Sequence, residues 1–184
     1  GDVYKVRKNG SDELFAVNVI VKTSRTAQRS EEQSRELAIM KSLSGKHPNL
    51  MKLLGWRDTA FNFQLFMPLY TMDLRKHIRS APSPISFRNG KTIISQLCSA
   101  VAYLHENEFM HRDIKPPNIL IKCQPLAAVL GDFGSAKAFL PGLPMTPKMC
   151  TLWHRAPEIL ANQEAYDLSS DVWSLGITFV EIEL

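Results

Sequence analysis

The sequence predicts an α+β protein, with a β-rich part first and an α-helical part after it. Before Pro68, short apolar or alternating runs are separated by turn signals, which is typical of strands. After Pro68, apolar residues recur at helical spacing over longer stretches. With 184 residues and 45% apolar content, the chain is long enough to bury a sizeable core.

Four strands are predicted in the N-terminal part. Residues 3–7 and 14–21 flank the turn signal Asn9-Gly10, which predicts a β-hairpin. Residues 50–54 and 61–67 are two further candidates, because both are short apolar runs.

Three helices are predicted. The first begins at the capping box formed by residues 30–33 and ends before Gly45. The second is capped by Ser86, and its apolar positions (Ile94, Leu97, Val101 and Leu104) lie on one face. The third begins near Ser170, and because it has little polar surface we expect it to be buried on most sides.

Composition narrows the classes of partner and location. A net charge of +4 is compatible with an anionic ligand such as a nucleotide, but it is too weak to indicate nucleic acid binding. The absence of a run of about 18 apolar residues argues against a membrane span. The three cysteines form no C-x-x-C pair, which favours a reducing intracellular setting, the cytoplasm or nucleus.

The most informative segment is H-R-D-I-K-P-P-N at residues 111–118, followed in order by Asp132-Phe133-Gly134 and Ala156-Pro157-Glu158. Together these motifs resemble the signature set of the eukaryotic protein kinase catalytic domain, over essentially the whole chain. The resemblance implies a two-lobed fold: a partial N-lobe over residues 1–67, a hinge over 68–73, and a partial C-lobe over 74–184 that ends at helix F. We therefore expect the chain to be truncated at both ends.

The resemblance also implies a chemistry, the transfer of the ATP γ-phosphoryl group to protein hydroxyls with Mg²⁺. Asp113 would position the acceptor hydroxyl, and Asn118 and Asp132 would hold the metal, which prefers hard oxygen ligands. Lys115 would contact the γ-phosphate, and Lys at this position is typical of Ser/Thr kinases. Singly, Asp113, Asn118 and Asp132 are equally well explained as turn residues. Their joint order favours the kinase site.

Further positions around the nucleotide follow from the same resemblance. Glu36 matches the helix residue that pairs with the nucleotide-binding Lys. The remaining positions surround the base: Gly1 and Val3 in the glycine-rich loop, Ala16 and Leu120 on either side of the adenine, Met67 as gatekeeper, and Pro68 to Tyr70 as hinge. Met40, Leu53, His111 and Phe133 match the regulatory spine, and ordinary core packing explains them equally well. Asp171 would anchor the catalytic loop.

Residues 151–155 (T-L-W-H-R) resemble the cyclin-dependent and mitogen-activated branch, which usually has Tyr where His154 stands. The branch implies substrates with Ser or Thr followed by Pro, and an activating subunit or upstream kinase. Thr146 matches its activation-loop phosphorylation site. Arg35, Arg112 and Lys137 match the three cations that would receive the phosphate, although Arg and Lys are more commonly solvated surface charges.

The chain departs from the family at Asn18, where the nucleotide-binding Lys is expected. Asn is neutral and shorter, so it cannot supply a cation or an ion pair with Glu36. Losing one such contact lowers rates by about 10²–10³. Lys5 and Lys22 are candidate substitutes. The sequence therefore leaves open a Ser/Thr kinase, a pseudokinase that binds nucleotide or partners without efficient catalysis, and a non-functional remnant.

Overall fold

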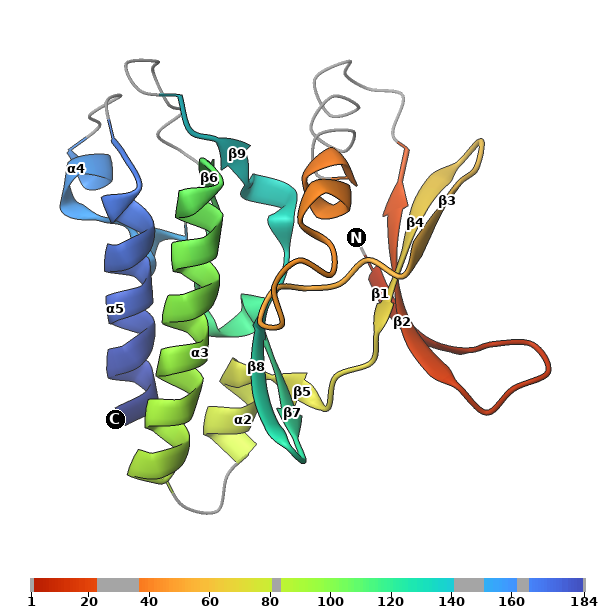
Figure 1. Cartoon of the computed structure of the whole chain (residues 1–184), viewed down its shortest axis with the longest axis horizontal. Helices are drawn as coiled ribbons and strands as arrows, with labels where there is room; N and C mark the ends of the chain where they lie inside the picture. Colours follow the sequence, from red (N-terminus) through yellow and green to blue (C-terminus); the bar gives the residue numbers. More distant parts are fainter. Residues whose placement is uncertain (1, 23–36, 81–83, 141–150, 162–165, 184) are drawn as a thin grey trace.

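The computed structural model describes residues 2–22, 37–80, 84–140, 151–161 and 166–183. It has a β-sheet-rich part, at the right in Figure 1, and a helical part at the left, in agreement with the predicted α+β class. Gly1, Arg35, Glu36 and Thr146 lie outside the described residues.

The β-rich part contains a four-stranded antiparallel sheet with the order β1-β2-β4-β3. Its strands are β1 (Asp2–Arg7), β2 (Leu14–Val21), β3 (Gly55–Asp58) and β4 (Asn62–Pro68). The predicted hairpin of the first two strands is confirmed, and Gly10 in its turn has φ +74°, a conformation that strains residues with a Cβ.

Strand register determines which side chains share a face of this sheet. Asn18 of β2 lies between Val3 of β1 and Leu65 of β4, and directly opposed residues point to the same side. Leu65 is only 2% exposed and belongs to the hydrophobic core. Asn18 therefore lies on the face of the sheet that turns toward the rest of the molecule.

The predicted strand at residues 50–54 is wrong. Leu50 forms only an isolated bridge with Leu130, and β3 begins at Gly55. Leu50, Met51 and Leu53 are 2%, 3% and 9% exposed. The apolar run therefore reflects core packing of an irregular segment, which a strand pattern does not distinguish.

The helical part contains α2 (Leu74–Ser80), α3 (Phe87–Glu106), α4 (Pro157–Leu160) and α5 (Ser169–Glu183). Residues 37–43 are also helical. The predicted cap of α3 is confirmed, because Ser86 Oγ accepts a hydrogen bond from Asn89 N at 3.3 Å.

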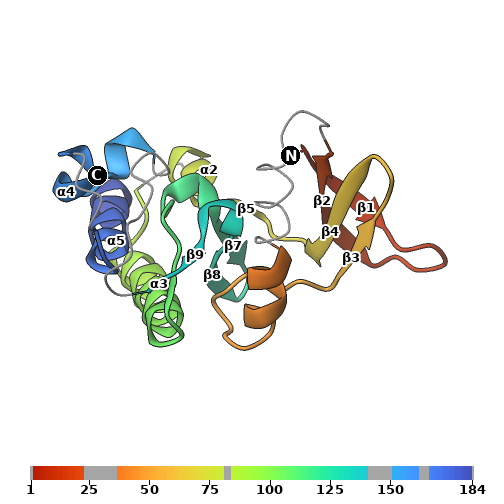
Figure 2. The ribbon, with the colours of Figure 1, turned by 90° about the horizontal axis from the view of Figure 1, so that it is seen from above.

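Helices α3 and α5 lie side by side in both Figure 1 and Figure 2. Gly90 of α3 faces α5, since a Cβ there would lie 2.9 Å from Glu183 Oε1 and 3.4 Å from Ile182 Cγ2. Ile182 is consequently buried, but Val172, Trp173 and Val180 on α5 are 56%, 46% and 54% exposed. The expectation that α5 is buried on most sides is wrong, because the helix packs against α3 and η3 while Val172, Trp173 and Val180 stay exposed.

Short strands and turns in the helical part were not predicted. The strands β5 (Met72–Asp73), β7 (Ile119–Cys123) and β8 (Leu126–Leu130) form one antiparallel sheet. A second pair consists of β6 (Phe109–Met110) and β9 (Lys137–Ala138). Three single-turn 3₁₀ segments are η1 (Pro116–Asn118), η2 (Phe133–Ser135) and η3 (Leu152–His154).

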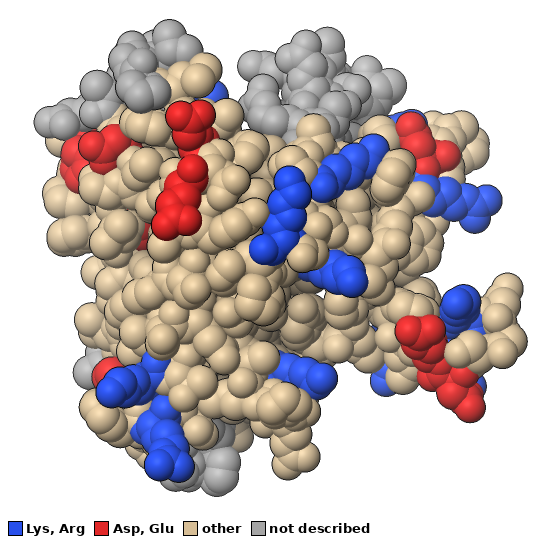
Figure 3. Space-filling model, viewed as in Figure 1, with Lys and Arg blue, Asp and Glu red and all other residues tan. Residues whose placement is uncertain are grey.

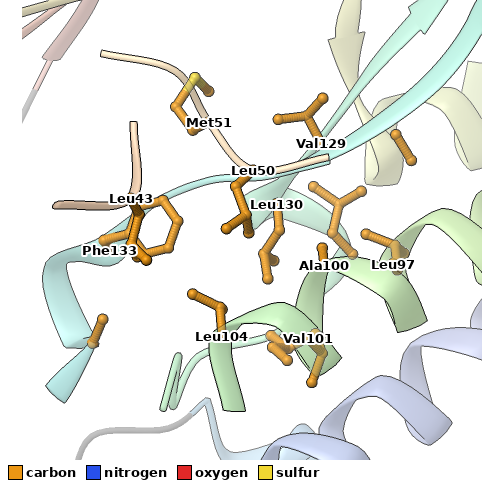
Figure 4. Packing of buried hydrophobic residues seen from close by; sticks show 14 of the residues in the cluster. Leu43, Leu50, Met51, Leu97, Ala100, Val101, Leu104, Val129, Leu130 and Phe133 are labelled. Carbon is orange, nitrogen blue, oxygen red and sulfur yellow. The ribbon is translucent and has the colours of Figure 1, made fainter. Parts of the chain in front are cut away.

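One hydrophobic core connects the two parts. Leu65 and Met67 of β4 belong to the same cluster as Leu97 and Leu104 of α3. Figure 4 shows its centre, where Leu50 and Leu130 lie above α3 and Phe133 lies beside Leu43. This continuous packing fixes the segments that carry the sequence motifs against α3.

Surface charge is mixed on the face seen in Figure 1. Figure 3 shows acidic side chains gathered at the upper left, and lysine and arginine side chains in the centre and at the lower left. This distribution is consistent with the mild net charge of +4.

Candidate active site

The H-R-D segment is held in place by Asp171, the buried acid of α5. The Asp171 carboxylate is 1% exposed and accepts hydrogen bonds from the backbone N–H groups of His111 and Arg112, each at 2.8 Å. His105 Nε2 lies 3.0 Å from the same carboxylate. The predicted anchoring role of Asp171 is thereby confirmed.

Asp113 lies in a network of polar contacts. Its Oδ2 is 2.7 Å from Lys115 Nζ, and its Oδ1 accepts a hydrogen bond from Thr151 Oγ1 at 2.8 Å. Lys115 Nζ also donates to Thr151 Oγ1 at 2.7 Å. Thr151 thus closes a triangle with the two residues of the predicted catalytic loop.

These contacts keep Asp113 ionised. Burial of this carboxyl group acts to raise its pKa, but the hydrogen bonds from Lys115 and Thr151 and the positive charge of Lys115 outweigh that effect. The net result is a pKa below the usual value for Asp. A carboxylate in this state can accept a hydrogen bond from a hydroxyl group near neutral pH.

Asn118 and Asp132 are brought together by the β7–β8 hairpin. Asn118 immediately precedes β7 and Asp132 follows shortly after β8, so both lie at the open end of the hairpin. The contact is direct in the backbone, where Gly131 N donates to Asn118 O at 2.9 Å. Asn118 Nδ2 donates to Asp113 Oδ2 at 3.0 Å, which links this end to Asp113.

The chemistry of this donor set fits Mg²⁺. Since Asn118 uses its amide nitrogen on Asp113, its amide oxygen remains for a cation. Asp132 adds a solvent-exposed carboxylate, and its left-handed backbone (φ 58°) is a conformation that Asp tolerates better than most residues. An amide oxygen and a carboxylate are the hard ligands that Mg²⁺ prefers.

The predicted spine residues are all buried. Met40, Leu53 and Phe133 belong to one core cluster, and the His111 ring lies 5.4 Å from the Phe133 ring, centroid to centroid. His111 Nε2 also lies 2.9 Å from Gly131 O. These four residues therefore belong to the buried interior. His111 also connects the H-R-D segment to the D-F-G segment.

Asn18 faces the interior without a polar partner for its side-chain oxygen. Asn18 Oδ1 is buried and has no hydrogen bond among the described residues. Neither candidate Lys replaces the missing cation here. Lys22 pairs with Asp58 and lies over the Phe63 ring, with its Nζ 4.4 Å from the ring centroid. Lys5 is exposed and lies opposite Ala16, two residues before Asn18 on β2.

Two of the residues predicted to surround the adenine lie directly opposite each other on neighbouring strands. Ala16 of β2 and Met67 of β4 are directly opposed, and Pro68 ends β4. Leu120 of β7 and Tyr70 are both partly buried and pack against the core, and burial raises the pKa of Tyr70. Val3 lies opposite Asn18 and is 65% exposed.

Of the three predicted phosphate-binding cations, two can be placed. Lys137 of β9 pairs with Met110, immediately before the H-R-D segment. Arg112 is 3% exposed and its Nε donates to Ser135 O at 2.7 Å. Arg112 is therefore not a solvated surface charge, and Thr146 and Arg35 lie outside the described residues.

Three contacts of the site were not predicted. They are His105 with Asp171, Arg112 with Ser135, and Thr151 with Asp113. Only Thr151 carried a sequence signal, since it precedes the A-P-E motif. His154, the departure from Tyr, is buried and its Nε2 lies 2.7 Å from Glu181 Oε1.

Comparison with protein families supports the predicted fold. A model of the protein kinase domain family matches residues 1–184, the whole chain. The match bears out the eukaryotic kinase resemblance and, in general terms, phosphotransfer as the activity. Across the described part of the chain, no helix is both long and apolar enough to span a membrane.

Proposed function

Because the chain belongs to the protein kinase domain family, we propose that it transfers the γ-phosphoryl group of Mg-ATP to Ser and Thr hydroxyls of proteins. The observation that carries this proposal is the environment of Asp113. Its ionised carboxylate lies within hydrogen-bond distance of both Lys115 and Asn118.

Each residue has a role in this reaction. Asp113 orients the acceptor hydroxyl and accepts its proton, while Lys115 offsets negative charge on the transferred group. Asn118 and Asp132 would hold Mg²⁺, and the ion would offset the charge of the phosphates. Thr151, which bonds both Asp113 and Lys115, positions the two side chains relative to each other.

The finer assignments follow from the sequence. The T-L-W-H-R segment favours the cyclin-dependent and mitogen-activated branch, with Ser-Pro or Thr-Pro substrates. Phosphorylation of Thr146 by an upstream kinase, or an activating subunit, would switch the activity on. The cysteine pattern supports a location inside the cell, in the cytoplasm or nucleus.

Asn18 supports a second candidate, a pseudokinase that binds nucleotide or partners without efficient catalysis. Its amide oxygen is buried, has no hydrogen bond among the described residues and stands where a cation would be required, and Lys22 is already paired with Asp58. The complete set of Asp113, Asn118 and Asp132 favours the enzyme over this alternative.

A phosphate-transfer assay with radiolabelled ATP and a generic protein substrate separates the two candidates. The enzyme predicts slow transfer by the natural protein, a gain of about 10²–10³ in Asn18→Lys, and complete loss in Asp113→Ala. Lys22→Ala is the control and should leave the rate unchanged. If a fluorescent ATP analogue binds every form and none transfers phosphate, the pseudokinase is correct.

A further inference from the structure

We propose that a basic surface pocket beside the catalytic loop receives an anionic side chain of the protein substrate, a few residues from the acceptor hydroxyl. This inference rests on the proposed function and specifies its substrate class. The pocket has a volume of about 530 Å³. It is lined by Asp73, Arg75, Lys76, Arg79, Ser80 and Pro117.

The position of the pocket connects it to the reaction. Helix α2, which supplies the basic residues, packs against η1, and η1 contains Pro117 and Asn118. Pro117 therefore lines the pocket and lies between Lys115 and Asn118 in the chain. An extended peptide advances about 3.3 Å per residue. A substrate whose hydroxyl lies at Asp113 can thus place a nearby side chain in this pocket.

The pocket carries excess positive charge. Its one acid, Asp73, accepts a hydrogen bond from Lys76 N at 2.8 Å and lies 3.5 Å from Lys76 Nζ. Lys76 and Asp73 therefore offset each other. Arg75 and Arg79 lie one helical turn apart, are exposed, and have no ion pair within the part of the chain that the structure describes.

These two arginines determine the chemistry of the ligand. A guanidinium group presents paired N–H donors that match the two oxygens of a carboxylate or the oxygens of a phosphate. The occupant is therefore an Asp, Glu or phosphorylated side chain of the substrate. Basic residues at the same substrate positions would be rejected by charge repulsion.

The test measures peptide binding separately from catalysis. Peptides of equal length, with the acceptor Ser changed to Ala, carry Asp and Glu, phosphoserine, Asn and Gln, or Lys within four residues of that position. Fluorescence anisotropy with the 184-residue chain gives the dissociation constants. We expect the acidic and phosphoserine peptides to bind at least tenfold more tightly than the uncharged peptide, and the difference to shrink at high salt.

Charge reversal locates the effect. Arg75→Glu with Arg79→Glu should abolish the preference for acidic peptides. The matched control is Arg88→Glu with Lys91→Glu, since these residues line a pocket of similar size, about 580 Å³, on α3. The control should retain the preference. Because all four side chains are exposed, circular dichroism should show unchanged folding in both variants.

Three results would overturn the inference. The acidic and uncharged peptides could bind equally tightly, or both double variants could lose the preference for acidic peptides to the same extent. In the third result, an oligonucleotide would displace the bound acidic peptide at a lower concentration than unlabelled acidic peptide does. The last would assign the pocket to nucleic acid. If acidic peptides bind as expected but neither the natural protein nor Asn18→Lys transfers phosphate, the proposed enzyme activity is wrong and the proposed binding of acidic side chains in the pocket is retained. If phosphate is transferred equally to acidic and uncharged substrates that also bind equally, only the pocket fails.

Discussion

Replacing Asp171 with Ala should destabilise the protein by about 2–4 kcal/mol and release the loop that carries Asp113. In the native protein the 1% exposed carboxylate accepts two backbone hydrogen bonds of 2.8 Å and lies 3.0 Å from His105 Nε2. Each backbone donor left buried without a partner costs about 1–3 kcal/mol. The substitution also removes the charge opposite His105.

Backbone strain offsets part of this loss. Arg112 has φ 66°, a left-handed conformation that costs an ordinary residue about 1–2 kcal/mol. Asp171 holds it there through the Arg112 N–H. Without the anchor, the loop can relax and recover this energy, which is why we expect a net effect in the lower half of the summed range.

Urea denaturation followed by circular dichroism measures the free energy of unfolding. The matched control is Asp167→Ala, because exposed Asp167 accepts from Ser169 N at 2.8 Å beside the same helix and its loss should cost about 1 kcal/mol. If Asp171→Ala is no less stable than this control, the anchoring argument is refuted.

Three further substitutions test separate contacts. Asn18→Val removes a buried amide oxygen that has no hydrogen bond within the described part of the chain, and it should raise the free energy of unfolding by about 1 kcal/mol in urea denaturation; an unchanged value would mean that the oxygen is solvated. Lys115→Met should raise the pKa of Asp113 in a carboxyl ¹³C NMR titration, because burial remains while the hydrogen bond and the positive charge of Lys115 are lost. In the natural protein, ionised Asp113 contributes stability that is complete above its unfolded pKa, about 3.9, and is lost as the pH falls through its lower folded pKa. Because the folded pKa is higher in the variant, this contribution is smaller, and the loss of stability on acidification that comes from Asp113 should shrink. Ser86→Ala removes the cap of α3 and should lower the melting temperature by a few degrees, corresponding to about 1 kcal/mol, whereas Ser86→Asp should not.

Sequence patterns predicted the helices and strands that are determined by residues close together in the chain. The Asn9-Gly10 turn and its flanking runs gave the hairpin, and Ser86 with the apolar face behind it gave α3. Residues 50–54 had the same apolar character but form no strand, since their burial comes from contacts with distant β8 and α3. Tertiary packing decided that segment.

The candidate site divides in the same way. Asp113, Asn118 and Asp132 could be predicted because their spacing forms a linear motif, and Asp113 and Asn118 are in direct contact. The network around Asp113 could not be predicted in full. Thr151 reaches Asp113 from 38 positions along the chain, and no spacing rule connects residues that far apart.

The pairing of β7 with β8 determines how Asn118 and Asp132 are positioned relative to each other. Ile119 stands opposite Leu130, and Cys123 opposite Leu126 near the turn. An added residue in the turn would only lengthen a surface loop, but one added within either strand would shift the ladder and turn alternate side chains to the opposite face. Insertions and deletions should therefore be tolerated in the turn of this hairpin and not within β7 or β8.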